Sequence, residues 1–409
     1  MVDRFARRSS PDNFPDISEP TLGEYQERSI INFTHGYASP DHLPADALAA
    51  VSDEVFGEHS SRALQYGPAA GLDHLREPLV AYLEEHYEID TTLDNLMITT
   101  GAKQGLDLVC KAMIEPGDRV ALTSPTYGTG LRILRSHEVE FLDVPVDEDG
   151  MVVSELEAAF EELAAAGEDL PKFVYDVPEF HNPTGVTMSR ERRERLVELA
   201  AEYDVVIVED APYRTLRFEG ESVPPVKSFD DDDGNVVFLG TYSKLICPGL
   251  RVGWLIADEG IVDRLLPLKP DGGTNPMSQA YISELHKNGY VEERAVDYAE
   301  VLGDQRDVMV EAIREHLPQV DIWNVPEGGY YIWLELPKHV DTELMYEIGK
   351  DIGVLFLPGN LFSPGEAHRN FLRLAWAYED PEQIVEGVKR LSDVIDAYEE
   401  RTDSPSASD

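Results

Sequence analysis

Hydrophobic residues between about residues 70 and 260 fall into two alternating patterns. Short runs rich in β-branched residues alternate with longer stretches in which Leu, Val and Ala recur every three or four positions. The short runs predict strands at 95–99, 119–123, 139–143, 172–177, 205–209, 236–240 and 252–257. The longer stretches predict helices at 72–87, 102–115, 154–166 and 189–203. Strands that alternate with helices are typical of βαβ units, so the pattern predicts an α/β fold with a mostly parallel seven-stranded sheet and helices on both faces.

The pattern changes after Pro276. A long helical stretch at 291–317 precedes strand-like segments at 320–325, 330–336 and 371–376. A last helix should begin at Asp380-Pro381, because Gln383 completes a capping box with Asp380 and Pro favours the first helical position. We therefore predict a large domain of residues 45–290 and a smaller α+β domain of residues 1–44 and 291–409, with a disordered tail at 401–409.

Acidic residues dominate the charge: 34 Lys and Arg stand against 79 Asp and Glu, and the formal net charge is −45. Such a charge repels nucleic-acid phosphates and anionic lipids, so we expect neither nucleic acid nor a membrane as a partner. The acidic residues are spread over the predicted helices, as in Glu84-Glu85, and concentrated salt would screen their repulsion. We therefore expect a halophilic, cytoplasmic protein. The two cysteines, Cys110 and Cys247, also favour a reducing compartment.

Chemically informative residues follow five of the predicted strands. Ligands of an open parallel sheet bind beyond the carboxyl ends of its strands, so these residues should share one site. In chain order they are Gly101-Ala102-Lys103, Ser124-Pro125-Thr126-Tyr127, His181-Asn182-Pro183-Thr184-Gly185, Asp210-Ala211-Pro212-Tyr213, and Thr241-Tyr242-Ser243-Lys244 with Gly249-Leu250-Arg251. Each motif alone has an ordinary explanation as a helix start, a turn, a cap or a solvated lysine.

Taken together, these residues match what a phosphorylated pyridine aldehyde requires from a protein. A helix N-terminus and an arginine can hold its phosphate, an aspartate can keep its ring nitrogen protonated, and a lysine can bond its aldehyde. The pair Gly128 and Gly130 lacks the third glycine of a dinucleotide loop, and the histidines show no paired zinc motif. We therefore expect no dinucleotide and no catalytic metal.

The chain resembles the class I aminotransferases of the fold-type I pyridoxal-phosphate enzymes. The motifs that carry the resemblance are Asn182-Pro183-Thr184-Gly185, Asp210 with Pro212-Tyr213, Ser243-Lys244 with Pro248-Gly249-Leu250-Arg251, and Leu372-Arg373-Leu374. It is most similar to the branch with 2-aminoadipate, kynurenine and aromatic aminotransferases. The resemblance implies a homodimeric transaminase that uses a ping-pong cycle. It would move the amino group of an aromatic, branched-chain or other apolar amino acid, or 2-aminoadipate, to 2-oxoglutarate.

The resemblance also implies catalytic roles for Lys244, Asp210 and Tyr213. Lys244 would bond the cofactor aldehyde and then carry a proton, with the charge of Arg251 favouring its neutral amine. Asp210 would pair with the pyridine nitrogen. Asn182 and Tyr213 would bind the oxygen on the ring.

Further residues would hold the cofactor and the substrate by the same resemblance. Tyr127 would stack on the ring. The phosphate would lie among Gly101, Ala102, Lys103, Thr241 and Arg251, with Tyr66 reaching in from a partner subunit. Arg373 would bind the substrate carboxylate as a bidentate fork, beside Gly36 and Asn182.

Two departures from the family and two other functions remain open. Relatives usually carry Ser-Gln where this chain has Ala102-Lys103, and residues 16–28 do not match the arginine-bearing helix of relatives that act on acidic side chains. The second departure argues against a long acidic donor. One alternative is a lyase or decarboxylase on the same fold. The other is a non-catalytic effector-binding domain of a transcription regulator, which the acid excess and the short segment before the homology disfavour.

Overall fold

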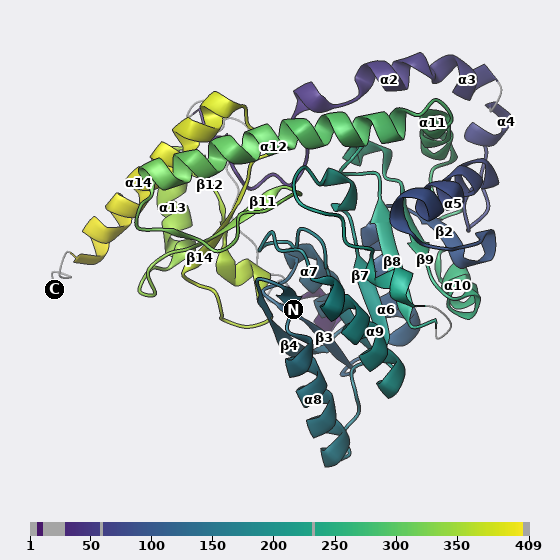
Figure 1. The fold of residues 1–409 in the computed structure, drawn as a ribbon, viewed down its shortest axis with the longest axis horizontal. Helices are drawn as coiled ribbons and strands as arrows, with labels where there is room; N and C mark the ends of the chain where they lie inside the picture. The colour runs from purple at the N-terminus through teal and green to yellow at the C-terminus, as the bar shows by residue number, and fades with distance from the viewer. Residues whose placement is uncertain (1–5, 11–28, 58–59, 231–233, 404–409) are drawn as a thin grey trace.

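The computed structural model describes residues 6–10, 29–57, 60–230 and 234–403. Residues 16–28, the segment that does not match the arginine-bearing helix, lie outside the described residues. The main element is an eight-stranded sheet in the order β2-β9-β8-β7-β6-β3-β4-β5, seen at the centre of Figure 1. Its strands are β2 (Leu96–Thr99), β3 (Arg119–Ser124), β4 (Glu140–Asp147), β5 (Gly150–Met151), β6 (Phe173–Asp176), β7 (Val206–Asp210), β8 (Val236–Thr241) and β9 (Gly253–Ile256).

The seven predicted strands are all present, and an eighth extends the sheet. Strands β4, β3, β6, β7 and β8 are parallel to one another, whereas β9 is antiparallel to both β2 and β8. The predicted number of seven strands was wrong, because β5 was not predicted. This strand pairs with the end of β4 in a hairpin. Two residues are too short to produce a hydrophobic pattern of their own.

Buried side chains alternate between the two faces of the sheet, as the period of a strand requires. Val174 of β6 and Ile207 of β7 pack in one core with helices α8 (Val153–Ala166) and α9 (Arg190–Tyr203). Tyr175 and Val208 belong to the other core, with helices α5 (Asp73–Tyr87), α6 (Ala102–Met113) and α7 (Gly128–Ser136). Helices therefore cover both faces, which confirms the predicted α/β layering.

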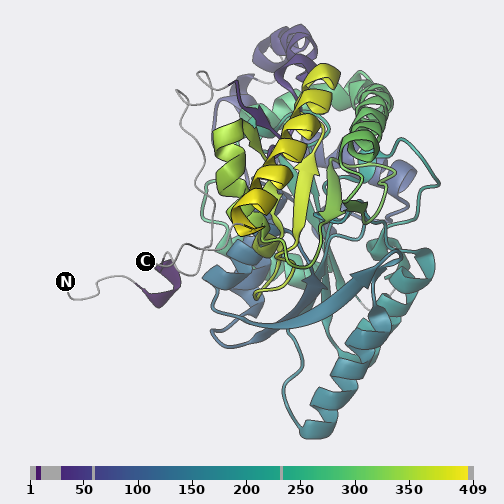
Figure 2. The same cartoon turned by 90° about the vertical axis from the view of Figure 1, so that its left-hand side faces the viewer.

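A smaller sheet is built mainly from the C-terminal part of the chain. Its strands are antiparallel in the order β10 (Asp321–Ile322), β11 (Tyr331–Glu335), β14 (Phe371–Ala375) and β13 (Leu357–Pro358). The N-terminal part of the chain contributes a strand to this unit, because β1 (Ile31–Asn32) pairs in parallel with β12 (Val354–Leu355) in a separate two-stranded sheet. Figure 2 shows α14 (Pro381–Asp403) in front of this sheet. This smaller α+β unit confirms the second part of the predicted fold.

Helices connect the two sheets and surround them. Figure 1 shows α12 (Tyr290–His316) running along the upper edge of the molecule toward α14. The remaining helices of the described chain are α2 (Ala45–Ala50), α3 (Ser52–Gly57), α4 (Ser60–Ala63), α10 (Glu259–Leu265), α11 (Pro276–Lys287) and α13 (Thr342–Ile352). In the part of the chain that the structure describes, no helix is long and apolar enough to cross a membrane.

Helix α14 begins as the sequence predicts and ends later. The backbone N–H of Gln383 donates to Oδ1 of Asp380, and the backbone N–H of Asp380 donates to Oε1 of Gln383, so the capping box is present. The helix continues through Asp403, so the first three residues of the predicted disordered tail are helical. Residues 404–409 lie outside the described part. The domain boundaries at residues 45 and 291 stay a prediction.

Candidate active site

A cavity of about 210 Å³ opens beyond the carboxyl ends of the parallel strands. Most of its lining residues come from the loops that follow β2, β3, β7 and β8, as the strand-end rule predicts. The lining residues are Tyr37, Gly101, Ala102, Lys103, Tyr127, Asp210, Pro212, Tyr213, Thr241, Ser243, Lys244, Pro248 and Arg251. Nine of the predicted site residues therefore share one cavity.

One end of the cavity is formed by the N-terminus of α6. Gly101 caps this helix with a φ of +80°, a left-handed conformation that disfavours a side chain. A Cβ on Gly101 would also lie 2.7 Å from Nη2 of Arg251, so the glycine lets the guanidinium approach the helix end. Arg251 donates to the carbonyl oxygen of Thr100 at 2.9 Å. Helix N–H groups and a cation at one point form a site for an anion such as phosphate.

A hydroxyl pair lies beside this anion site. Oγ1 of Thr241 donates to Oγ of Ser243 at 2.9 Å, and the backbone N–H of Ser243 donates back to Oγ1 of Thr241 at 3.1 Å. Nη1 of Arg251 donates to Oγ of Ser243 at 3.4 Å. Thr241, Ser243 and Arg251 thus present hydroxyl and guanidinium groups to the same end of the cavity.

Asp210, the last residue of β7, lies deep in the cavity and is 5% exposed. Its Oδ2 accepts a hydrogen bond from the hydroxyl of Tyr175 at 2.9 Å. Its buried Oδ1 has no hydrogen-bond partner among the residues that the structure describes. Burial raises the pKa of Asp210 to about 6, against the opposing effects of the Tyr175 hydrogen bond and of the charges on Lys244 and Lys103. An unpartnered buried carboxylate oxygen is suited to a cationic ring nitrogen.

Lys244 lies in the loop after β8 with its amine in the same cavity. Its Nζ donates to the carbonyl oxygen of Gly36 at 2.5 Å and lies 5.7 Å from the ring centre of Tyr213. Burial lowers the pKa of Lys244, and the positive charges of Lys103 and Arg373 act in the same direction. Arg251, which was expected to have this effect, is not among the main causes, since its guanidinium contacts the residue before the α6 terminus.

A chain of hydrogen bonds runs from the cavity to the smaller sheet. The hydroxyl of Tyr213 donates to the hydroxyl of Tyr331 at 3.2 Å and accepts from Nδ2 of Asn182 at 3.4 Å. Nη1 of Arg373 donates to Oδ1 of Asn182 at 3.1 Å. Arg373 is only 4% exposed, and its guanidinium lies 4.1 Å from the ring centre of Tyr331. Strands β11 and β14 thereby bring an arginine and a tyrosine to a site formed mainly by the larger sheet.

The family model described as "Aminotransferase class I and II" matches residues 28–391, which is most of the chain. The chain belongs to this family. It is an aminotransferase, and its cofactor is pyridoxal phosphate. The predicted family is therefore confirmed.

Individual aminotransferases match over almost their whole length. The chain is 38% identical to "Aromatic-amino-acid aminotransferase 1" of Thermococcus litoralis over 90% of this chain and 88% of that protein. It superimposes with a TM-score of 0.89 on the multiple substrate aminotransferase from Thermococcus profundus, at 36% identity over 97% of this chain and 98% of that one. The Pyrococcus horikoshii kynurenine aminotransferase, solved in complex with PMP, gives a TM-score of 0.87 at 36% identity over 92% of this chain and 93% of that one.

The residues of this aminotransferase fit pyridoxal phosphate at three separated points. The α6 N-terminus, with Arg251 and Ser243, is suited to the phosphate, and the unpartnered Oδ1 of Asp210 is suited to the protonated ring nitrogen. The amine of Lys244 is suited to the aldehyde. In the described part of the aminotransferase, no group of three or more His, Cys, Asp or Glu side chains could hold a metal ion.

Four predicted site residues lie outside the cavity lining. Gly36 borders it through its carbonyl oxygen, and a Cβ at this position would lie 2.0 Å from the hydroxyl of Tyr331. Asn182 and Arg373 reach it through Tyr213. Tyr66 does not join the site of its own chain, because its side chain is 85% exposed.

Two residues at the site were missed from the sequence, and a third, Ser243, was expected there but given no role. Ser243 precedes the predicted lysine directly, and its hydroxyl could have been considered for the phosphate. Tyr37 follows Gly36 and lines the cavity. Tyr331 gives no local signal, because it is one of several aromatic residues in a buried strand and its position depends on how the smaller sheet packs.

Proposed function

We propose that this protein transfers the amino group of an aromatic, branched-chain or other apolar amino acid, or 2-aminoadipate, to 2-oxoglutarate by a ping-pong mechanism. The observation that carries the proposal is that the Lys244 amine and the unpartnered Oδ1 of Asp210 share one cavity, to which the buried Arg373 is connected through Asn182 and Tyr213. The relatives named for aromatic amino acids and kynurenine support the same class of donor.

Each residue has a role in this proposal. When bound, pyridoxal phosphate supplies a ring that stabilises negative charge at Cα of the substrate. Asp210 would hold the ring nitrogen in its protonated form, and the Lys244 amine would accept the proton from Cα of the substrate. The lowered pKa of Lys244 favours the neutral amine that this proton transfer requires.

The remaining roles concern orientation. Tyr213 and Asn182 would hold the oxygen on the ring, and Tyr127, which lines the same cavity, would pack against the ring. Gly101, Ala102 and Lys103 at the start of α6 bind the phosphate together with Thr241 and Arg251. Arg373 binds the substrate carboxylate as a fork, beside the backbone of Gly36 and the amide of Asn182.

A panel of amino donors with 2-oxoglutarate tests the proposed reaction. We expect parallel double-reciprocal lines when donor and acceptor are varied, and one equivalent of pyridoxamine phosphate when a donor is added without acceptor. Tyrosine, leucine and 2-aminoadipate cover the proposed donors. Release of carbon dioxide or ammonia without pyridoxamine phosphate would show a decarboxylase or a lyase instead. Amino-acid binding without turnover would show an effector domain.

We also propose that the active form is a homodimer in which Tyr66 reaches the phosphate of the partner subunit. Three apolar or aromatic side chains lie exposed on neighbouring segments, with exposed fractions of 48% for Phe56, 65% for Leu64 and 85% for Tyr66. Neighbouring exposed apolar side chains are typical of a surface that is buried in a protein–protein interface. A fully active monomer in sedimentation velocity would exclude this arrangement.

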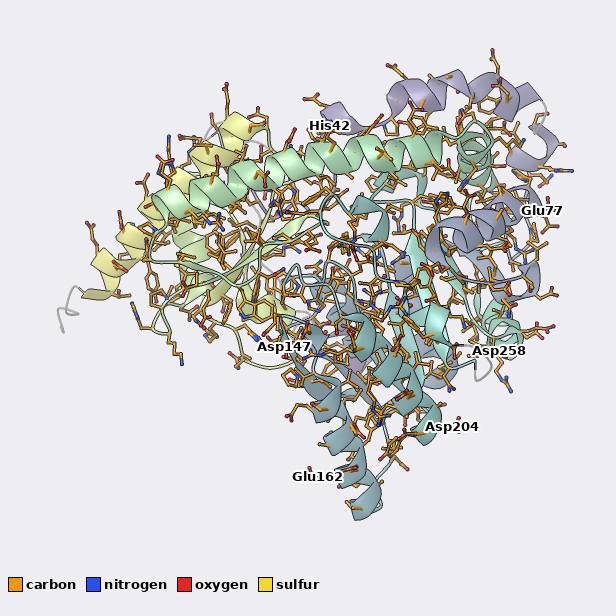
Figure 3. All side chains as sticks on the ribbon, viewed as in Figure 1. His42, Glu77, Asp147, Glu162, Asp204 and Asp258 are labelled. Atoms are coloured by element: carbon orange, nitrogen blue, oxygen red, sulfur yellow. The ribbon has the colours of Figure 1, made fainter. Side chains whose placement is uncertain are left out.

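We further propose that the protein functions in a cytoplasm of high salt concentration. Figure 3 shows the exposed residues Glu77, Glu162, Asp204 and Asp258 at the periphery of the molecule, on different elements. The two thiols Cys110 and Cys247 are free, as in a reducing compartment. The carboxylates on this surface should repel one another strongly in dilute buffer.

Potassium chloride should therefore raise the melting temperature of the protein. Between about 0.1 M and about 1 M salt, the screening length falls from about 10 Å to about 3 Å, which removes most of the repulsion between surface carboxylates. Scanning calorimetry at several salt concentrations measures this directly. An equal or lower melting temperature in molar salt would contradict a halophilic origin.

A further inference from the structure

A second cavity, of about 110 Å³, adjoins the proposed cofactor site. Tyr127 lines both cavities, and Arg373 lines the second one. The other lining residues come from α7 and from the segment after β13, and they are Gly128, Thr129, Arg132, Arg135, Leu357, Leu361 and Phe362. A substrate held by Arg373 would therefore extend its side chain into this cavity.

The charge of this second cavity is unusual for so acidic a protein. Three of its lining residues are arginines, namely Arg132, Arg135 and Arg373, and no Asp or Glu is among the described residues that line it. One arginine is enough for the carboxylate that every amino acid and 2-oxo acid carries. Two more cations beside it fit a second carboxylate, because guanidinium groups bind carboxylates through paired hydrogen bonds.

Arg135 and Arg132 lie one turn apart on α7, and we consider their contacts separately. Nη2 of Arg135 donates to the carbonyl oxygens of Ser363 at 3.1 Å and of Pro364 at 2.9 Å. Its guanidinium therefore fixes the chain that carries Leu361 and Phe362 as a wall of the cavity. The backbone N–H of Thr126 adds a bond to the carbonyl oxygen of Phe362 at 2.8 Å.

The charge of Arg132 also acts on the cofactor cavity. The pKa of Lys103, which lines the cofactor cavity, is lowered by burial first, then by Arg251 and also by Arg132. Arg132 is thus close enough to the first cavity to act on its charges while lining the second. The same cavity is also lined by the apolar residues Leu357, Leu361 and Phe362.

We infer that Arg132 binds the distal carboxylate of a dicarboxylic substrate, such as 2-oxoglutarate, glutamate or 2-aminoadipate, while Arg373 holds the carboxylate next to the reacting carbon. Arg135 is a positioning residue for the wall. The apolar walls accept the side chain of an aromatic or aliphatic donor in the same cavity. This inference rests on the proposed transamination and names the residue that gives it a dicarboxylic partner.

The test compares two acceptors of similar length in the holoenzyme and in its Arg132→Gln variant. For 2-oxoglutarate, the loss of one charge-assisted contact should lower kcat/KM by about 10- to 100-fold, mainly through KM. For 2-oxohexanoate, which lacks the distal carboxylate, kcat/KM should change by less than about threefold. Turnover of 2-oxohexanoate also shows that the variant is folded and carries its cofactor.

A binding measurement and a matched control complete the test. Glutarate should bind the wild-type holoenzyme as a competitive inhibitor, and Arg132→Gln should weaken it by the same factor while the inhibition by hexanoate is unchanged. The control Arg190→Gln removes an exposed arginine of α9 that pairs with Glu194, and it should change neither acceptor. The conservative variant Arg132→Lys keeps the charge without the fork and should fall between wild type and Arg132→Gln.

Several outcomes would overturn the inference. An equal loss for both acceptors would make Arg132 a structural or general catalytic residue, and an unchanged 2-oxoglutarate reaction would place the distal carboxylate elsewhere. A wild-type enzyme that prefers 2-oxohexanoate would overturn the inference and leave transamination standing. A wild-type holoenzyme that aminates neither acceptor would overturn the proposed function itself.

Discussion

Replacing Lys244 with alanine should lower the rate of transamination by about 10⁴-fold or more, because in the proposed mechanism one amine both bonds the cofactor and moves the substrate proton. The other lysine of the cavity cannot take over this role. Lys103 is exposed at the start of α6, whereas the Lys244 amine lies against the backbone of Gly36 in the cavity. Single-turnover kinetics with saturating donor measures the loss.

The matched control is Lys338→Ala. Lys338 is exposed between β11 and α13, so its removal should leave the rate within about twofold of wild type. Without cofactor, Lys338→Ala should keep the melting temperature of the wild-type protein, and Lys244→Ala should keep or exceed it, since an amine held in the cavity is costly to desolvate. A Lys244→Ala variant with near-normal turnover would remove this residue from the mechanism.

Asp210→Asn should lower kcat by about 10²- to 10³-fold, because an amide cannot hold a proton on the ring nitrogen as a carboxylate does. The change is nearly isosteric, and the remaining amide oxygen can still accept the hydrogen bond of Tyr175. The loss should therefore appear in kcat more than in KM. The control Asp263→Asn alters an exposed aspartate of α10 and should leave the rate unchanged. Equal losses in both variants would contradict the role of Asp210.

The same substitution should stabilise the protein without cofactor. The folded-state pKa of Asp210 is raised to about 6, so the folded state binds its proton more tightly than the unfolded state does. Stability from this group is complete below the unfolded pKa and is lost as the pH rises to about 6, by about 2–3 kcal/mol. Asp210→Asn removes that loss. Its cofactor-free form should exceed wild type in unfolding free energy at pH 7, and the gap should close toward pH 4.

Adding pyridoxal phosphate should make the wild-type protein more stable than Asp210→Asn, the reverse of the order without cofactor. In the proposed site the carboxylate of Asp210 would gain a cationic partner, so cofactor should raise the melting temperature of wild type more than that of Asp210→Asn. Denaturant titrations across this pH range, with and without cofactor, measure both effects. An Asp210→Asn variant that gains nothing at pH 7 would show that the carboxylate is not strained by burial.

The fold was largely predictable because its central strands are buried on both faces. Continuous apolar runs such as Val236–Thr241 are easily distinguished from the helical stretches that flank them. The two-residue β5 and the direction of β9 were not predictable. A strand of two residues has no pattern, and the direction of β9 follows from the path of the chain between β8 and β9 rather than from its composition.

The candidate site likewise has residues that could be predicted from the sequence and residues that could not. Gly101, Asp210 and Lys244 follow strands of one sheet, so the topology alone brings them together. The position of Tyr331 depends instead on how the smaller sheet packs against the loop after β7, and the surroundings of Arg132 depend on how the segment after β13 packs against α7. Those contacts join positions far apart in the chain, and a single sequence carries no signal for them.

The most direct test of the central claim is to map the cofactor-bearing lysine. The protein would be purified in molar potassium chloride with pyridoxal phosphate, reduced with borohydride, digested and analysed by mass spectrometry. We predict one modified site, at Lys244, and no modification in Lys244→Ala. A label on Lys103 or on any other lysine in its place, or no label at all, would contradict the assignment of this cavity as the active site.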